Sequence, residues 1–148
     1  MTTPRNDRAI DILLVEDDPG DELITREAFE ENKIKNVVHV ARDGEEGLDF
    51  LYRRGAYADA PRPDLILLDL NLPKYDGRQL LEKIKSDADL CDIPIVVLTT
   101  SSAQEDVLRS YKLHANAYVT KPVDLDQFMH AVRQIDDFFV QVVRLPGV

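Results

Sequence analysis

The sequence predicts an α/β fold in which a doubly wound parallel sheet of five strands is covered by five helices. Two observations predict this class: short apolar runs alternate with segments of helical spacing, and three of the runs are almost continuously apolar. Continuous apolar runs are typical of strands buried on both faces in a parallel sheet, whereas alternation indicates one face in water. Helices must therefore lie on both sides of the sheet.

Five apolar runs have the length of a strand, and each is predicted as one. They are Ile10–Val15, Val37–Ala41, Leu65–Leu68, Ile95–Leu98 and Ala117–Val119. The first, third and fourth are the continuously apolar ones. All are far shorter than the roughly 20 apolar residues that a membrane-spanning helix needs, so we expect no membrane span.

Apolar residues recur at helical spacing between these runs, which predicts five amphipathic helices. The positions are Leu23, Ile24 and Ala28; Leu48, Leu51 and Tyr52; Leu80, Leu81 and Ile84; Val107, Leu108 and Tyr111; and Leu125, Phe128, Met129, Val132 and Ile135. Residues typical of helix starts are Asp18 before Pro19, Asp43 with Glu46, Ser102 with Glu105, and Asp124 with Gln127. Alternating strands and helices with right-handed crossovers favour the flavodoxin-like strand order 2-1-3-4-5.

The composition is that of one acidic globular domain. The chain has 148 residues, with 18 Lys and Arg against 28 Asp and Glu, for a net charge of −10. This length suits a single domain, and the negative charge disfavours nucleic acid as a partner. The polar first residues lack the apolar core of a signal peptide, and the single Cys91 cannot form an internal disulfide, so we expect a cytoplasmic protein.

Polar residues follow four predicted strands at their carboxyl ends, where ligands bind in doubly wound sheets. The segments are Glu16-Asp17-Asp18, Asp69-Leu70-Asn71, Thr99-Thr100-Ser101 and Thr120-Lys121-Pro122. An acid in such a place is usually a helix cap, which is our interpretation of Asp18, and a lysine is usually solvated. Glu16, Asp17 and Asp69 differ, because clustered carboxylates repel one another unless they are protonated or bridged by a cation.

A divalent cation resolves this repulsion. With oxygen ligands and no suitable His or Cys cluster, the metal expected is Mg²⁺. Lys121 then offers a second cation to a phosphoryl group, and the hydroxyl of Thr99 offers a hydrogen bond to a phosphoryl oxygen. A carboxylate can be the nucleophile in such a site, giving an aspartyl phosphate. The strand ends therefore predict phosphoryl transfer.

These motifs resemble the receiver domains of bacterial two-component response regulators. The matching segments are Val15-Glu16-Asp17-Asp18, Leu67-Leu68-Asp69-Leu70-Asn71-Leu72-Pro73 followed by Asp76-Gly77, Val97-Leu98-Thr99-Thr100, and Tyr118-Val119-Thr120-Lys121-Pro122. The resemblance implies an N-terminal tail at 1–9, a receiver domain at 10–138 and a C-terminal extension at 139–148. Glu16 stands where many receivers have Asp, which affects metal geometry more than function.

The resemblance also implies a role for each site residue. Asp69 is implied as the acceptor of a phosphoryl group from a phosphohistidine of a sensor histidine kinase, with Thr99 and Lys121 contacting the phosphoryl oxygens. The implied Mg²⁺ ligands are Glu16, Asp17, Asp69 and the main-chain carbonyl of Asn71. Tyr118 matches the family's aromatic switch, which turns inward as Thr99 moves toward the phosphoryl group. The Lys121–Pro122 bond is expected to be cis.

A narrower resemblance is to the small stand-alone regulators associated with bacterial and cyanobacterial phytochromes. It is carried by Tyr52-Arg53-Arg54-Gly55, Ala60-Pro61-Arg62-Pro63-Asp64, Thr99-Thr100-Ser101-Ser102 and residues 138–146. It implies that the partner kinase is of the phytochrome type.

Three other functions fit part of the pattern. A phosphatase of the haloacid-dehalogenase type needs a second Asp two residues after its nucleophile, where this chain has Asn71. A flavodoxin-type FMN module needs a phosphate loop after the first strand, where this chain has acids. A pseudo-receiver that binds partners without phosphorylation is disfavoured by Asp69, Thr99 and Lys121. We therefore expect no enzyme activity beyond the chain's own phosphorylation and dephosphorylation.

The expected output is a changed protein interface. No DNA-binding or enzymatic segment is evident after the receiver motifs, so we expect the surface of the fourth helix, fifth strand and fifth helix to contact an unknown downstream protein. Apolar residues near the C-terminus favour a homodimer interface over a segment folded back on its own domain. They are Phe138, Phe139, Val142, Val143 and Leu145.

Overall fold

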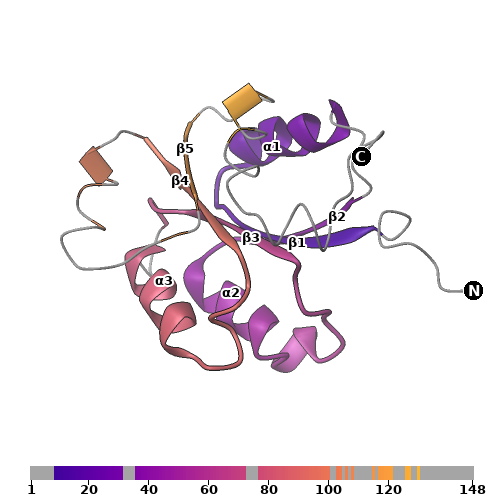
Figure 1. Cartoon of the computed structure of the whole chain (residues 1–148). Helices are drawn as coiled ribbons and strands as arrows, with labels where there is room; N and C mark the ends of the chain where they lie inside the picture. The colour runs from indigo at the N-terminus through magenta and orange to yellow at the C-terminus, as the bar shows by residue number, and fades with distance from the viewer. Residues whose placement is uncertain are drawn as a thin grey trace, which may run out of the picture.

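The computed structural model describes most of the predicted sheet. The described residues are 9–31, 36–72, 77–100, 103–104, 106, 108, 115, 117–121, 126–127 and 130. Within them five parallel strands form one sheet in the order β2-β1-β3-β4-β5 (Figure 1). The predicted α/β class and strand order are confirmed.

Each strand lies within one residue of its predicted bounds. The strands are β1 (Ile10–Val15), β2 (Asn36–Ala41), β3 (Leu65–Asp69), β4 (Ile95–Thr99) and β5 (Ala117–Thr120). Every residue of β3 and β4 is buried, as their continuous apolar runs predict. Because the strands are parallel, the residues that follow them meet along one side of the sheet. We call this side, formed by residues 16–17, 69–71, 99–100 and 120–121, the carboxyl edge.

Helices cover both faces of the sheet. Figure 1 shows α1 on one face and α2 and α3 on the other. The elements are α1 (Pro19–Glu31), α2 (Gly44–Leu51), the short 3-10 helix η2 (Gly55–Tyr57) and α3 (Gly77–Ser86). Asp18 Oδ1 accepts a hydrogen bond from the Gly20 N–H at 2.9 Å, and Asp43 Oδ1 accepts one from the Glu46 N–H at 2.8 Å. These two predicted helix caps are confirmed.

The other two predicted helices fall mostly outside the described residues. The positions described as helical there are Ala103, Gln104, Asp106, Leu108, Asp126, Gln127 and His130. The predicted caps at Ser102 and Asp124, the Lys121–Pro122 bond and the C-terminal extension also lie outside the described part of the chain. No helix among the described residues is long and apolar enough to span a bilayer.

The buried face of α1 differs from the one that its apolar residues suggest. Leu23 and Ile24 are 57% and 36% exposed. Thr25 is buried instead, and its hydroxyl donates a hydrogen bond to the main-chain carbonyl of Asp21 at 3.0 Å. A helical threonine can be buried because the backbone satisfies its hydroxyl, so apolar spacing alone does not identify this face.

An apolar core cluster lies between the sheet and the helices α2 and α3. Its members include Leu13, Val15, Leu48, Phe50, Ile66, Leu68, Leu80, Leu81 and Ile84. The start of α3 lies very close to the end of β3, since a Cβ at Gly77 would be 2.6 Å from the main-chain oxygen of Asp69 and 2.8 Å from Cα of Leu70. Only glycine fits there. Gly77 therefore permits the start of α3 to pack directly against the main chain of Asp69, the last residue of β3.

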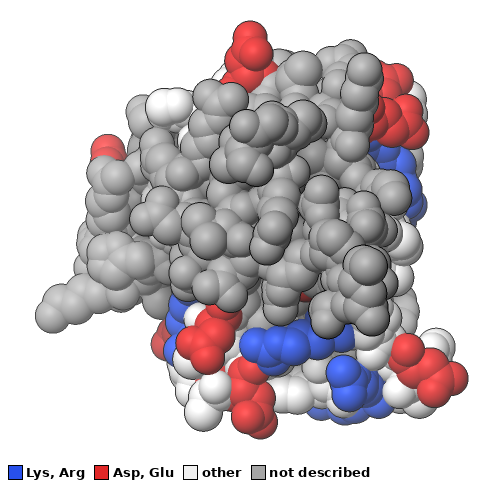
Figure 2. All heavy atoms as spheres, turned by 45° about the vertical axis from the view of Figure 1, so that its right-hand side comes forward, with Lys and Arg blue, Asp and Glu red and all other residues white. Residues whose placement is uncertain are grey.

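Acidic and basic side chains lie next to one another along the lower margin of the face that Figure 2 shows. Glu22 of α1 forms ion pairs with Arg42, at 2.6 Å, and with Arg26, at 2.9 Å. Ion pairs at a protein surface each contribute up to about 1 kcal/mol, so these two add little to the stability of the fold. The buried ion pairs of the carboxyl edge are a different case.

Candidate functional site

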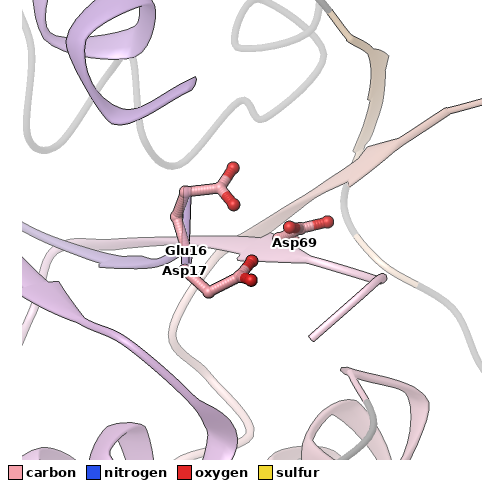
Figure 3. A group of neighbouring side chains, drawn as sticks. All are labelled: Glu16, Asp17 and Asp69. Atoms are coloured by element: carbon pink, nitrogen blue, oxygen red, sulfur yellow. The ribbon is translucent and has the colours of Figure 1, made fainter. Parts of the chain in front are cut away.

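Three carboxylates meet at the carboxyl edge. Glu16 and Asp17 follow β1, and Asp69 ends the neighbouring strand β3. Oxygens of the three side chains lie within 4.8 Å of one another, and Figure 3 shows the carboxylates gathered at the ends of the two strands. Glu16 and Asp69 are 0% and 2% exposed, whereas Asp17 is exposed. The fold therefore holds two acidic side chains close together and away from water.

Lys121, the residue after β5, enters this cluster. Its Nζ lies 2.7 Å from Oε1 of Glu16 and 3.0 Å from Oδ2 of Asp69. A third carboxylate, Asp21 in the first turn of α1, accepts a hydrogen bond from the same ammonium at 2.9 Å. Asp21 was not among the predicted site residues. The available signal was its place in the first turn of a helix that begins two residues after Asp17.

Burial sets the protonation of this group. It raises the pKa of Glu16 to about 8; the nearby Asp69 adds to the rise and Lys121 opposes it. Burial alone would lower the pKa of Lys121, but its ion pairs with Glu16, Asp21 and Asp69 outweigh this effect and hold that pKa well above its ordinary value. Lys121 is therefore charged at neutral pH, and its ammonium forms ion pairs with three acidic side chains.

The donor set fits a divalent cation. Oε1 of Glu16 is buried and, among the described residues, has an ion pair with Lys121 but no hydrogen bond of good geometry. Carboxylate oxygens from Glu16, Asp17 and Asp69 are hard ligands of the kind that Mg²⁺ and Mn²⁺ take. A cation here would satisfy the oxygen that Lys121 leaves without a hydrogen bond and would offset the excess negative charge.

Three further predicted residues lie around the cluster. The main-chain N–H of Asn71 donates a hydrogen bond to Oδ1 of Asp69 at 2.9 Å, which orients the carboxylate. Thr99 ends β4, beside β3, and is 2% exposed; its main-chain oxygen accepts a hydrogen bond from the Lys121 N–H at 2.7 Å. Tyr118 lies further back on β5, half-buried, and its hydroxyl accepts a hydrogen bond from the Ala115 N–H at 3.1 Å.

A side-chain amide that the sequence analysis missed connects the segments after β3 and β4. Gln104 Oε1 accepts hydrogen bonds from the Thr100 N–H at 2.8 Å and the Thr100 hydroxyl at 3.2 Å. Gln104 Nε2 donates to Asn71 Oδ1 at 2.6 Å. A glutamine just inside a predicted helix carries no signal in sequence, because its partner 33 residues away is set by the fold.

Buried acids, a charged lysine and a buried threonine at the carboxyl edge of a doubly wound sheet define a class of protein: a domain built to hold a phosphoryl group beside a cation. The model of the response regulator receiver domain matches residues 12–133. The chain therefore belongs to the receiver domain family of response regulators, whose members are generally signalling proteins.

Individual relatives match nearly the whole chain. Response regulator Rcp1 of Synechocystis sp. is 46% identical over 136 residues, which are 92% of each chain. The structure of the phosphorylated cyanobacterial phytochrome response regulator RcpA superposes with a TM-score of 0.74 at 45% identity, covering 95% of this chain and 100% of that one. A Mn²⁺-bound form of response regulator Rcp1 gives a TM-score of 0.73 at 45% identity, covering 93% and 99%. The narrower resemblance to stand-alone phytochrome regulators is confirmed.

Proposed function

We propose that Asp69 accepts a phosphoryl group from a phosphohistidine of a sensor histidine kinase. One observation carries this proposal: the almost fully buried Asp69 carboxylate lies 3.0 Å from the ammonium of Lys121, within the three-acid cluster at the carboxyl edge. The phosphorylated state of the relative RcpA supports it, because a chain of the same fold and 45% identity takes a phosphoryl group.

The proposed phosphoryl transfer is a nucleophilic displacement at phosphorus. A carboxylate oxygen of Asp69 forms the new O–P bond, the N–P bond of the phosphohistidine breaks, and its electron pair stays on the imidazole nitrogen of the kinase. Lys121 offsets the charge of the incoming phosphoryl oxygens, and the hydroxyl of Thr99 donates a hydrogen bond to one of them. The Asn71 N–H holds the carboxylate in orientation through Oδ1. Hydrolysis of the resulting acyl phosphate returns the domain to its resting state, and we propose no other enzyme activity.

A divalent cation completes the site. Glu16, Asp17, Asp69 and the main-chain carbonyl of Asn71 would hold it, and Mg²⁺ is the ion we propose. Bound there, it neutralises charge on the carboxylates and the phosphoryl group. The Mn²⁺-bound form of the relative Rcp1 supports a divalent ion in this chain.

Phosphorylation then changes a surface of the domain that contacts other proteins. We propose that Thr99 moves toward the phosphoryl group, that Tyr118 turns inward with it, and that a receiver unit spanning 10–138 presents the altered surface to a downstream protein. The relative RcpA, a cyanobacterial phytochrome response regulator, supports a phytochrome-type kinase as the donor. A cytoplasmic setting and a homodimer formed through the extension at 139–148 complete the proposal.

Intact mass after incubation with acetyl phosphate tests the acceptor. We expect one phosphoryl adduct that requires Mg²⁺ and that is absent from Asp69→Asn. The control is Asp49→Asn, a partly exposed acid of α2 outside the cluster, which should behave as the wild type. A folded wild type without an adduct would contradict the proposal and favour a pseudo-receiver.

Phosphotransfer from a purified, autophosphorylated phytochrome kinase tests the partner. We expect label to pass to the wild type and not to Asp69→Asn. Label that passes from kinases of other classes but not from phytochrome kinases would refute the phytochrome assignment and leave the acceptor intact. Sedimentation before and after phosphorylation tests the homodimer, which a monomer under both conditions would refute.

A further inference from the structure

The amide bridge of Gln104 connects the two segments that border Asp69 and Thr99. Asn71 lies two residues after Asp69 and holds its Oδ1 through a main-chain N–H. Thr100 directly follows Thr99 and gives both its N–H and its hydroxyl to Gln104 Oε1. Gln104 is thus hydrogen-bonded directly to both Asn71 and Thr100, and it connects the ends of β3 and β4 at the carboxyl edge.

The bridge occupies donors that an anion at this edge would use. A phosphoryl group on Asp69 brings anionic oxygens, and each needs hydrogen-bond donors or cations. The N–H and hydroxyl of Thr100 are such donors, and in the unphosphorylated structure both point to a neutral amide oxygen at 2.8 and 3.2 Å. A neutral acceptor binds N–H groups more weakly than an anionic one. A phosphoryl oxygen would therefore compete with Gln104 Oε1 for the donors of Thr100, and it would be the stronger acceptor.

We infer that Gln104 is a positioning residue that latches the segments after β3 and β4 in the unphosphorylated state and opposes phosphorylation of Asp69. The inference rests on the proposed function, because it assigns Gln104 a role at the same site. Gln104 does not touch the Asp69 carboxylate in the hydrogen bonds of the described residues; it acts through Thr100 and Asn71. Phosphorylation must therefore open the Gln104 bridge before Thr100 can turn to the phosphoryl group.

Binding of beryllofluoride, a phosphoryl analogue, in the presence of Mg²⁺ measures the competition. Gln104→Ala and Gln104→Met both remove the hydrogen bonds, and Met keeps the length of the side chain. We expect each to bind beryllofluoride about five-fold more tightly, the factor that corresponds to one net hydrogen bond. Gln104→Glu keeps an acceptor for Thr100, so its affinity should equal or fall below that of the wild type. Gln79→Ala, at an exposed position of α3, is the matched control and should bind as the wild type.

Hydrogen exchange of the Thr100 amide gives a second readout that needs neither metal nor phosphoryl group. We expect exchange in the unliganded protein to be at least about three-fold faster in Gln104→Ala and Gln104→Met than in the wild type, and unchanged in Gln79→Ala. Unchanged exchange in Gln104→Met, or unchanged beryllofluoride affinity, would overturn the latch. Tighter binding by Gln104→Ala alone would also overturn it, since bulk rather than hydrogen bonding would be responsible. If the wild type itself binds no beryllofluoride, the proposed phosphorylation of Asp69 is contradicted, and so is a role of Gln104 in opposing it. The exchange data would then show only whether the hydrogen bonds of Gln104 form.

Discussion

Acidic side chains lie at both edges of the parallel sheet, where the strands begin and where they end, but they differ in burial and in their partners. Near the amino edge, where the strands begin, Asp64 Oδ2 accepts a hydrogen bond from the Asp11 N–H at 2.9 Å, and His39 Nε2 lies 3.0 Å from Asp11 Oδ1. The side chains of Asp11 and His39 remain about a quarter exposed. At the carboxyl edge Glu16 and Asp69 are buried and share the ammonium of Lys121.

The difference separates a structural role from a functional one. The acids Asp11 and Asp64 each have a hydrogen-bond partner on a neighbouring segment and are only partly buried, so they connect the start of β1 to β2 and to the residue before β3. Acids at the carboxyl edge are held together against their own repulsion by the buried strands β1, β3 and β4. Burial beside a second acid raises the pKa of Glu16 to about 8, and shifts of this kind are typical of functional sites.

Lys121→Met should give the largest loss of stability, because it removes the ammonium that serves three carboxylates. We expect the free energy of unfolding to fall by about 3 kcal/mol, the scale for breaking a buried ion pair from one side. Urea unfolding measures it, with the exposed Lys83→Met as a control that should change by less than about 0.5 kcal/mol. Equal losses in the two variants would mean that the ammonium of Lys121 does not stabilise the buried acids of the carboxyl edge.

Gly77→Ala should cost about 2 kcal/mol, since its Cβ would meet the main-chain oxygen of Asp69 at 2.6 Å and something must shift. Gly47→Ala is the matched control, because the nearest atom to its Cβ is a Val15 methyl carbon at 3.4 Å. We expect the control to stay within about 1 kcal/mol of the wild type. Thermal unfolding compares the two. A Gly77→Ala protein as stable as the control would show that the backbone at Asp69 yields easily.

Asp64→Ala should lower the free energy of unfolding by about 1 kcal/mol, because one hydrogen bond to the Asp11 N–H is lost. It should leave the yield of phosphoryl adduct unchanged, since the residue lies at the amino edge. Asp59→Ala, an exposed acid in a turn, controls for loss of charge. A reduced adduct yield in Asp64→Ala would show that the two edges are coupled.

Tyr52→Phe should have the smallest effect, one that depends on pH. The Tyr52 hydroxyl donates a hydrogen bond to Asp87 at 2.6 Å and lowers the pKa of that carboxyl. A lowered pKa in the folded protein stabilises it above the pKa of the unfolded chain, and the gain is lost as pH falls through the folded value. The difference in free energy of unfolding between wild type and Tyr52→Phe should therefore shrink below about pH 4. A difference that stays constant from pH 7 to pH 3 would contradict this.

Much of the fold was predictable because it depends on local patterns. Short apolar runs located all five strands to within one residue, and Asp18 and Asp43 marked the starts of two helices. The cluster of Glu16, Asp17 and Asp69 followed from strand ends alone, because parallel strands bring their carboxyl ends together.

Other features depend on tertiary contacts that the sequence does not display. Asp21 joins the site because the fold brings the first turn of α1 to Lys121, which is 100 residues away in sequence. Gln104 bridges residues that are far apart in sequence. The exposed Leu23 and the buried Thr25 reverse the apolar pattern of α1, because a hydrogen bond to Asp21 satisfies the threonine.

The central claim is that Asp69, among the acids of the carboxyl edge, carries the phosphoryl group. Reduction of the phosphorylated protein with tritiated borohydride converts the acyl phosphate to a labelled alcohol, and peptide sequencing locates it. We predict label at residue 69 alone, dependent on Mg²⁺ during phosphorylation. Label at residue 16, 17 or 21, or no label in protein that has gained a phosphoryl mass, would contradict the claim.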